Sequence, residues 1–293
     1  MYEIIDKQTL SNGVTQYEIK APRIAAARKC GQFVIVRAFD HSERIPLTIA
    51  DVNRAKGSIT LIVQTVGKST SEMTCLEAGQ FFQDVAGPMG HSSEIKKYGT
   101  VVVIGGGLGT AVVYPQAVAL REASNKIISV IGARNKDLLI LQELLGSISE
   151  KLILTTDDGS AGMKGLVTDA LRNLIDDPQV GVDAIYCSGP VIMMKAVSEV
   201  SKPLNIPTVV SLNPIMVDGT GMCGGCRVTI DGETRFACVD GPEFDGHKVN
   251  YDELMDRQTT YQEQEKKQYD KYGHKHSCKC RKQKLIDNKD MQI

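Results

Sequence analysis

The sequence predicts an N-terminal β-barrel followed by a doubly wound parallel α/β domain, with a cysteine-containing segment and a polar tail after them. Short β-rich segments with turn residues fill residues 1–97, and apolar runs alternate with helical stretches over residues 98–214. Glycines and three cysteines mark residues 215–250, and residues 251–293 form a polar, basic, helical-looking tail. A chain of 293 residues is long enough for two cores.

The composition is typical of a globular protein and argues against membrane or nucleic-acid binding. The longest apolar stretch, 100–114, is short and interrupted by glycines, so we expect no transmembrane helix. The N-terminus lacks the regions of a secretory signal, which predicts a cytoplasmic protein. There, the eight cysteines are expected to be thiols or metal ligands rather than disulfides. The basic tail also contains acidic residues and has no aromatic stacking platform, so no nucleic-acid partner is expected.

Turn signals divide the first region into strands. "YEIID" and "VTQYEIK" flank "LSNG", whose Asn-Gly pair is typical of a tight hairpin. Three further β-branched segments follow at 31–39, 44–52 and 57–66, separated by Gly, Asp or Ser. Closely spaced strands of this kind predict a small barrel or sandwich.

The second region alternates buried strands with helices. Its first strand, "TVVVIGG", is a continuous apolar run suited to a parallel sheet, and four more are expected at 126–133, 151–157, 183–189 and 207–213. Between them we expect helices at about 110–124, 137–149, 165–175 and 190–201. This order predicts a doubly wound sheet.

A glycine-rich loop follows the first of these strands. Gly105 begins a run that leads into a helix, whose N-terminus offers free N–H groups to a pyrophosphate. Alone, the run is explained equally well by a tight strand–helix turn. Two further loops follow later strands and would meet the first at the carboxyl edge of the sheet. Together the loops predict nucleotide binding by Gly106, Gly107, Gly109, Thr110, Asp157, Asp158, Gly159, Gly189 and Pro190.

Two other residues of this region bear on the nicotinamide. Cys187 ends the fourth strand. It is either a small buried residue, as free cysteines usually are, or a catalytic residue close to a bound nicotinamide. Arg134 follows the second strand, where an acidic residue would bind a ribose 2′-hydroxyl. In physical terms Arg134 favours a 2′-phosphate and hence NADP.

Asp218, Cys223, Cys226 and Cys238 form the pattern D-x₄-C-x₂-C-x₁₁-C. Plant-type [2Fe–2S] proteins have cysteine at all four positions. The glycines between them suit a loop around a cluster, and a hairpin over "RVTI", "DGE" and "TRFA" would return Cys238 to Cys226. A zinc site that uses His247 is an alternative, although it lacks a second C-x₂-C pair, and unliganded thiols are another.

In this order the motifs resemble the ferredoxin–NADP⁺ reductase superfamily. Within it, they resemble electron-transfer subunits of dihydroorotate dehydrogenase and, more closely, the small (alpha) subunits of NADH-dependent reduced ferredoxin:NADP⁺ oxidoreductases, also named sulfide dehydrogenase beta subunits. The matching segments cover about residues 40–240: "RIPLTIAD", "VGKST", "GPMG", "GGGLGTAVVYPQ", "TDDGSAGMKGLVTD", "CSGPVIMMKA" and "DGTGMCGGCRV". Aspartate at position 218 matches the ferredoxin:NADP⁺ branch, whereas the dihydroorotate relatives carry cysteine there.

The resemblance implies FAD on the barrel, NAD(H) on the α/β domain, and a [2Fe–2S] cluster held by the aspartate and three cysteines. A Gly/Ser/Thr turn also suits an FAD phosphate on physical grounds, since it exposes N–H groups and hydroxyls. By position, the resemblance assigns FAD to Arg44, Pro46, Leu47, Thr48, Val63, Gln64, Thr65, Gly67, Ser69 and Thr70.

The implied function is hydride exchange with NAD(H) at FAD and transfer of single electrons to a larger partner subunit. That partner would carry a second flavin and [4Fe–4S] clusters, form a heterodimer with this chain and serve ferredoxin; electron bifurcation rests on the resemblance alone. Alternatives are an electron-transfer subunit for dihydroorotate or sulfide oxidation, and a nucleotide-binding redox sensor. In the tail, "HKHSCKC" at 274–280 is either a disordered or partner-contacting end or a soft-metal site.

Overall fold

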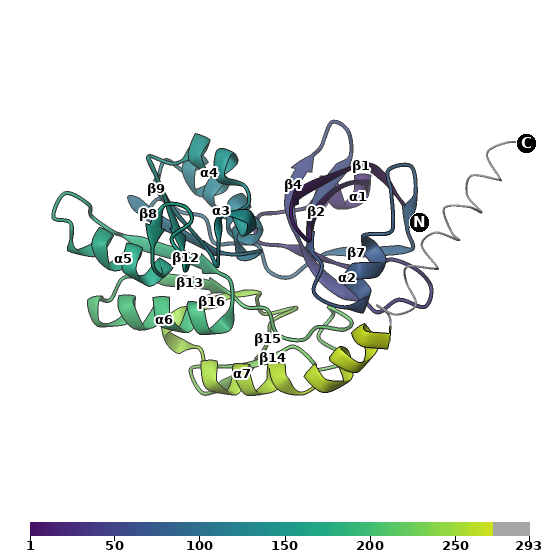
Figure 1. The fold of residues 1–293 in the computed structure, drawn as a ribbon. Coiled ribbons are helices and arrows are strands. Elements are labelled where there is room, and N and C mark those ends of the chain that lie inside the picture. Colours follow the sequence, from purple (N-terminus) through teal and green to yellow (C-terminus); the bar gives the residue numbers. More distant parts are fainter. Residues whose placement is uncertain (272–293) are drawn as a thin grey trace, which may run out of the picture.

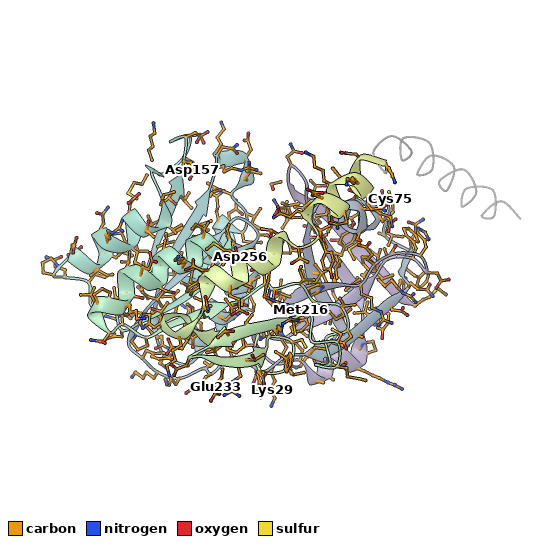
Figure 2. All side chains as sticks on the ribbon, turned by 90° about the horizontal axis from the view of Figure 1, so that it is seen from below. Lys29, Cys75, Asp157, Met216, Glu233 and Asp256 are labelled. Atoms are coloured by element: carbon orange, nitrogen blue, oxygen red, sulfur yellow. The ribbon has the colours of Figure 1, made fainter. Side chains whose placement is uncertain are left out.

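The computed structural model describes residues 1–271. Figure 1 shows two lobes, an N-terminal β lobe and an α/β lobe, with the C-terminal segment running beneath both. Figure 2, seen from below, shows the helix marked by Asp256 crossing in front of the junction between the lobes. The predicted fold class, a barrel followed by an α/β domain, is confirmed.

Seven antiparallel strands build the first lobe in the order β6-β1-β2-β5-β4-β3-β7. The predicted Asn-Gly hairpin is confirmed, because Ser11 pairs with Val14 across a two-residue turn. Two short helices, α1 (Pro22–Ala27) and α2 (Lys68–Met73), lie in the connections. The strands are β1 (Tyr2–Ser11), β2 (Val14–Lys20), β3 (Phe33–Arg37), β4 (Ile45–Asn53), β5 (Ser58–Gln64), β6 (Phe81–Phe82) and β7 (Asp84–Met89).

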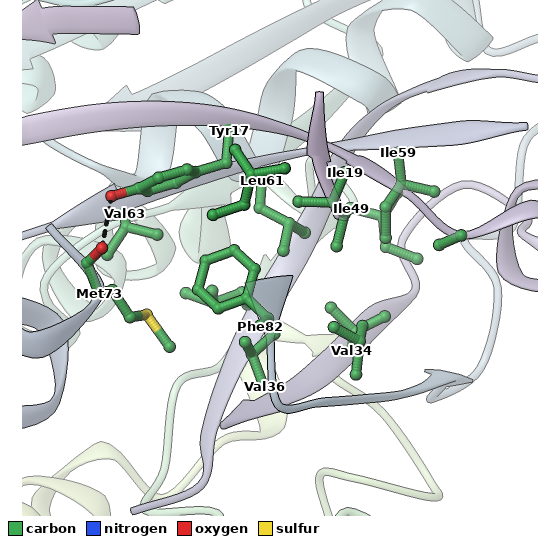
Figure 3. Packing of buried hydrophobic residues seen from close by; sticks show 14 of the residues in the cluster. Tyr17, Ile19, Val34, Val36, Ile49, Ile59, Leu61, Val63, Met73 and Phe82 are labelled. Carbon is green, nitrogen blue, oxygen red and sulfur yellow. Dashed lines mark hydrogen bonds between the residues drawn. The ribbon is translucent and has the colours of Figure 1, made fainter. Parts of the chain in front are cut away.

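Tyr17 on β2 joins this core to α2, as Figure 3 shows. Its ring is fully buried and meets Phe82 edge to face, with 5.4 Å between the ring centroids. Its hydroxyl donates a hydrogen bond of 2.8 Å to the carbonyl of Met73, the last residue of α2. Burial raises the pKa of the Tyr17 phenol. The core thereby fixes α2 and the turn at its start.

The second lobe is a sheet in the order β11-β10-β9-β8-β12-β13-β16. Its strands are parallel except β16, which pairs antiparallel with β13. The strands are β8 (Thr100–Gly106), β9 (Lys126–Ala133), β10 (Lys151–Thr156), β11 (Met163–Lys164), β12 (Ala184–Ser188), β13 (Thr208–Ser211) and β16 (Glu243–Asp245). Short 3₁₀ helices occur at Lys136–Leu138, Lys202–Leu204 and Gly246–Lys248.

Helices cover both faces of this sheet, which makes it doubly wound. α3 (Gly109–Glu122) and α4 (Gln142–Ile148) share one core cluster, and α5 (Val167–Asp176) and α6 (Val191–Ser201) share the other. The predicted helix at 137–149 was too long.

The chain departs from helical geometry before α4. Leu139 and Ile140 are buried apolar residues between the 3₁₀ turn and α4, and Leu141 has a φ of 57°. The expected continuous helix is therefore interrupted by an irregular segment in which the side chains of Leu139 and Ile140 point into the core.

The C-terminal segment leaves the sheet after β13 and rejoins it at β16. Between them, β14 (Arg227–Ile230) and β15 (Glu233–Phe236) form the predicted hairpin across a turn at Asp231 and Gly232, both with positive φ. This combination is typical of a type I′ turn. Beyond β16, α7 (Tyr251–Thr259) packs on α6, and a further helical stretch covers 262–271.

Three sequence expectations meet the structure in different ways. None of the helices within residues 1–271 is long and apolar enough to cross a membrane. Cys75, just after α2, is disulfide-bonded, contrary to the expectation that the cysteines are thiols or ligands. The segment 274–280 lies outside the described residues, so its metal-site hypothesis stays untested.

Candidate functional site

A cleft of about 740 Å³ separates the barrel from the α/β lobe, and all three parts of the chain line it. Strands β4 and β5 contribute from the barrel, the glycine loops contribute from the α/β sheet, and Met216 and Pro242 contribute from the C-terminal segment. Parallel sheets bind ligands beyond the carboxyl ends of their strands, and this cleft lies at that edge.

The predicted flavin residues divide between the cleft and other places. Four of them line the cleft: Pro46, Leu47, Thr48 and Gln64. Val63 is fully buried in the barrel core, because neighbouring residues on a strand face opposite sides. Thr65 follows β5, and its amide donates to the carbonyl of Gly13 at 2.7 Å.

The predicted phosphate turn lies at the start of α2. Thr70 Oγ1 accepts hydrogen bonds from the amides of Val66 (2.9 Å) and Gly67 (3.0 Å). Ser69 Oγ donates to the carboxylate of Glu43 at 3.0 Å. The turn is therefore preformed by its own hydrogen bonds, and it is joined to the loop that precedes β4.

The predicted nucleotide residues are also divided. Those that line the cleft are Gly106, Gly107, Gly109, Asp157, Gly189 and Pro190. Thr110 is fully buried, and its Oγ1 has no hydrogen-bond partner among the described residues. Asp158 and Gly159 are exposed and do not line the cleft. A hydrogen bond from Ser160 lowers the pKa of Asp158.

Glycine at 109 lets two of these loops touch. A Cβ atom there would lie 2.1 Å from the carbonyl oxygen of Ser188 and 2.7 Å from the amide of Gly189. Both neighbours are backbone atoms, so they cannot move aside as a flexible side chain would. The start of α3 and the end of β12 are thus in close backbone contact beside the cleft.

Ser188, rather than Cys187, is among the residues that line the cleft. The Cys187 side chain is 2% exposed and packs in the core on the α5–α6 face of the sheet, and burial raises the pKa of its thiol. Ser188 lines the cleft. Cys187 is thus buried in this structure, and its catalytic role stays a prediction. The alternation of side chains along a strand is the signal that would have pointed to Ser188.

The four predicted cluster ligands come as two pairs. Cys226 and Cys238 are buried, with 3.1 Å between their sulfurs, as the hairpin predicted. Asp218 Oδ2 accepts a hydrogen bond of 3.1 Å from the amide of Cys223. A hydrogen bond from the amide of Thr220 lowers the pKa of Asp218, whereas burial raises the pKa of Cys238.

This donor set fits a two-iron cluster. His247, the remaining ligand of the zinc alternative, has its Nε2 2.8 Å from Ser201 Oγ. Thiolates and backbone N–H groups that face sulfur are what [2Fe–2S] sites use. Here the amide of Cys238 lies 3.4 Å from Cys226 Sγ.

A second cavity, of about 540 Å³, joins the barrel to the cluster loop. Arg44, a predicted FAD residue, and Asp218, a predicted ligand, both line it, together with Arg37, Met89 and Met222. Gly219 permits the close approach, because its φ is +77° and a Cβ would lie 2.3 Å from Met89 Sδ. The structure therefore brings the flavin and cluster segments together.

Comparison with known proteins agrees with these features. The iron–sulfur cluster binding domain of dihydroorotate dehydrogenase B matches residues 213–250. A "dihydroorotate dehydrogenase B (NAD(+)), electron transfer subunit homolog" of Thermotoga maritima is 47% identical over 92% of this chain and 95% of its own. The electron-transfer subunit of Fusobacterium nucleatum is 30% identical over 78% of this chain and 89% of its own. The chain belongs to the family of dihydroorotate dehydrogenase B electron-transfer subunits and their homologues.

A solved structure of an NADH-dependent reduced ferredoxin-NADP oxidoreductase, described in terms of flavin-based electron bifurcation, is also similar. It is 46% identical, has a TM-score of 0.87, and the match covers 93% of this chain and 98% of that one. The fold is ferredoxin reductase-like, and the chain is an oxidoreductase-type electron-transfer subunit. Its cofactors are FAD, a [2Fe–2S] cluster and NAD(H).

Proposed function

We propose that this chain exchanges hydride with NAD(H) at FAD and passes single electrons through the cluster to a larger partner subunit. In this proposal the partner carries a second flavin and [4Fe–4S] clusters, and the heterodimer couples NADH, NADP⁺ and ferredoxin by electron bifurcation. The observation that carries the proposal is the cleft, because flavin residues, glycine loops and the ends of the cluster segment all line it.

Each part of the cleft has a physical role in this function. Pro46 and Leu47 present an apolar surface that excludes water from a flavin ring, and Thr48 and Gln64 add polar groups at its edge. The glycine loops expose backbone N–H groups to a nucleotide phosphate. Ser188 is the polar side chain on β12 that orients the nicotinamide. FAD converts a two-electron hydride into single electrons.

For the cluster we propose Asp218, Cys223, Cys226 and Cys238 as ligands. A carboxylate is a harder donor than a thiolate, so the aspartate should alter the cluster's potential. Asp218→Cys is expected to keep the cluster and to shift its midpoint potential. An unchanged spectrum and potential would show that Asp218 is not a ligand.

The nucleotide is proposed to be NAD(H). Arg134 lines the cleft and suits a 2′-phosphate, whereas the similar oxidoreductase is described as NADH-dependent. The test is anaerobic stopped-flow mixing of the FAD-loaded chain with NADH and, separately, with NADPH. We expect NADH to bleach the flavin faster. If neither nucleotide bleaches it rapidly, the reductase function is wrong and the redox-sensor alternative gains support.

A second candidate is an electron-transfer subunit that serves dihydroorotate oxidation. The match of residues 213–250 to the dihydroorotate dehydrogenase B domain favours it. Aspartate at position 218 favours the first proposal, because dihydroorotate relatives carry cysteine there. Copurification from the native source separates the two. A flavin and [4Fe–4S] partner supports the first, and a dihydroorotate dehydrogenase would replace it with the second.

A further inference from the structure

Helix α7 connects the α/β lobe to the cluster segment. Near its start, Tyr251 Oη lies 2.8 Å from Ser198 Oγ on α6. Near its end, Gln258 Nε2 donates to the carbonyl of Asn213 at 3.0 Å, at the beginning of the cluster segment. α7 lies beyond the matched domain, 213–250, so the family match does not explain its contacts.

Two arginines bind successive carbonyls of the cluster loop, between the second and third proposed ligands. Arg227 Nη1 donates to the Gly224 carbonyl at 3.1 Å. Arg257 Nη2, from the last turn of α7, donates to the Gly225 carbonyl at 3.1 Å. A guanidinium keeps its charge at any physiological pH. Permanent cations from two different elements, β14 and α7, therefore hold this loop.

One peptide group links Arg227 to a proposed ligand. The carbonyl of Gly224 accepts from Arg227, and the N–H of the same peptide, on Gly225, points at Cys223 Sγ across 3.5 Å. A cation on the carbonyl polarises the peptide and strengthens its N–H as a donor. Hydrogen bonds to sulfur and net charge set the potential of an iron–sulfur cluster. Reduction adds one negative charge to the cluster. A stronger N–H donor to sulfur and a nearby positive charge therefore both favour the reduced state.

We propose that Arg227 and Arg257 are positioning residues that clamp the Gly224–Gly225 loop and raise the reduction potential of the cluster. The proposal rests on the ligand set given above. It also assigns a role to α7, because Arg257 brings the helix that packs on the nucleotide-binding lobe into contact with the cluster loop. Both arginines bind carbonyls of the loop, so they act on the cluster through the backbone.

The test is a redox titration of the cluster, followed by electron paramagnetic resonance, in the full-length chain. Arg227→Gln and Arg257→Gln should each lower the midpoint potential. A tenfold lower ratio of reduced to oxidised cluster at fixed potential corresponds to about 59 mV for one electron. Arg257→Lys keeps the positive charge but not the planar guanidinium. Its midpoint potential should therefore lie between those of Arg257→Gln and the wild type. Iron release to a chelator should be faster in both Gln variants.

Arg235→Gln is the matched control. Arg235 lies on β15 of the same hairpin, forms an ion pair of 2.6 Å with Glu233, and carries the same charge without a bond to the loop. Its potential and iron release should equal those of the wild type. An equal shift in this control, or no shift in either clamp variant, would overturn the proposal. A wild-type chain without a [2Fe–2S] signal would refute the proposed ligand set instead.

Discussion

Replacing Gly109 by alanine should disrupt the nucleotide site through a single methyl group. The new Cβ would lie 2.1 Å from the Ser188 carbonyl oxygen, and Cβ atoms in real structures do not approach other heavy atoms within 3.0 Å. The start of α3 and the loop after β12 must therefore separate by about 0.9 Å. Overpacking of this kind typically costs about 1–3 kcal/mol of unfolding free energy.

The functional cost of Gly109→Ala should exceed the structural one. Both displaced loops line the cleft, and a misplacement of about 1 Å can reduce a rate by about 100-fold. We expect flavin reduction by NADH to slow by about 10- to 100-fold in stopped-flow measurements. Urea unfolding, followed by circular dichroism, measures the accompanying loss of stability.

Gly146→Ala provides the control for this substitution. Gly146 lies inside α4, and a Cβ there would meet only the side chain of Leu152, at an ordinary 3.5 Å. The same change should therefore stabilise the protein by about 0.5–1 kcal/mol and leave the rate unchanged. If Gly109→Ala is as stable as the wild type and equally fast with NADH, the close contact of the two loops is not required.

Two further predictions concern buried groups. Ser188→Ala should slow flavin reduction by NADH. Cys187→Ala should only lower the unfolding free energy, by about 1 kcal/mol. If only the Cys187 variant reduces the flavin more slowly, Cys187 rather than Ser188 acts at the nicotinamide. Burial raises the pKa of Glu243, so its contribution to stability is full at pH below 4.5 and is lost as the pH rises through its folded pKa. Glu243→Gln keeps an acceptor for Ser93 and Gln116, so urea unfolding from pH 4 to 8 should show a smaller loss of stability than in the wild type. An equal loss in both would show that Glu243 does not cause it.

Local chemistry made much of the fold predictable from the sequence. A two-residue turn at Asp231 and Gly232 requires positive φ, so the residues themselves determine the hairpin and bring Cys226 to Cys238. The glycine loops were predictable for the same reason, since a sharp strand–helix connection needs small residues. Family resemblance, rather than local pattern, supplied the flavin segments.

Features that depend on distant contacts were not predictable. Glu243 meets Ser93 across 150 positions of sequence, and no pattern in the three residues of β16 indicates that they complete the sheet. Alternation along β12 places Cys187 and Ser188 on opposite faces, but which of them meets the α5–α6 core depends on how those helices pack on the sheet. Arg257 lies in a polar helix, and only the folded chain shows that it binds the cluster loop.

The return of the chain to the sheet makes the cluster segment an insertion in topological terms. Ser211, at the end of β13, is paired with Glu243, at the start of β16, so the segment enters and leaves the sheet at adjacent points. Joining these two points by a short turn would leave an ordinary hairpin and the same strand order. The cluster segment is therefore a single excursion of the chain between two paired strands, and the order of the strands in the sheet does not depend on it.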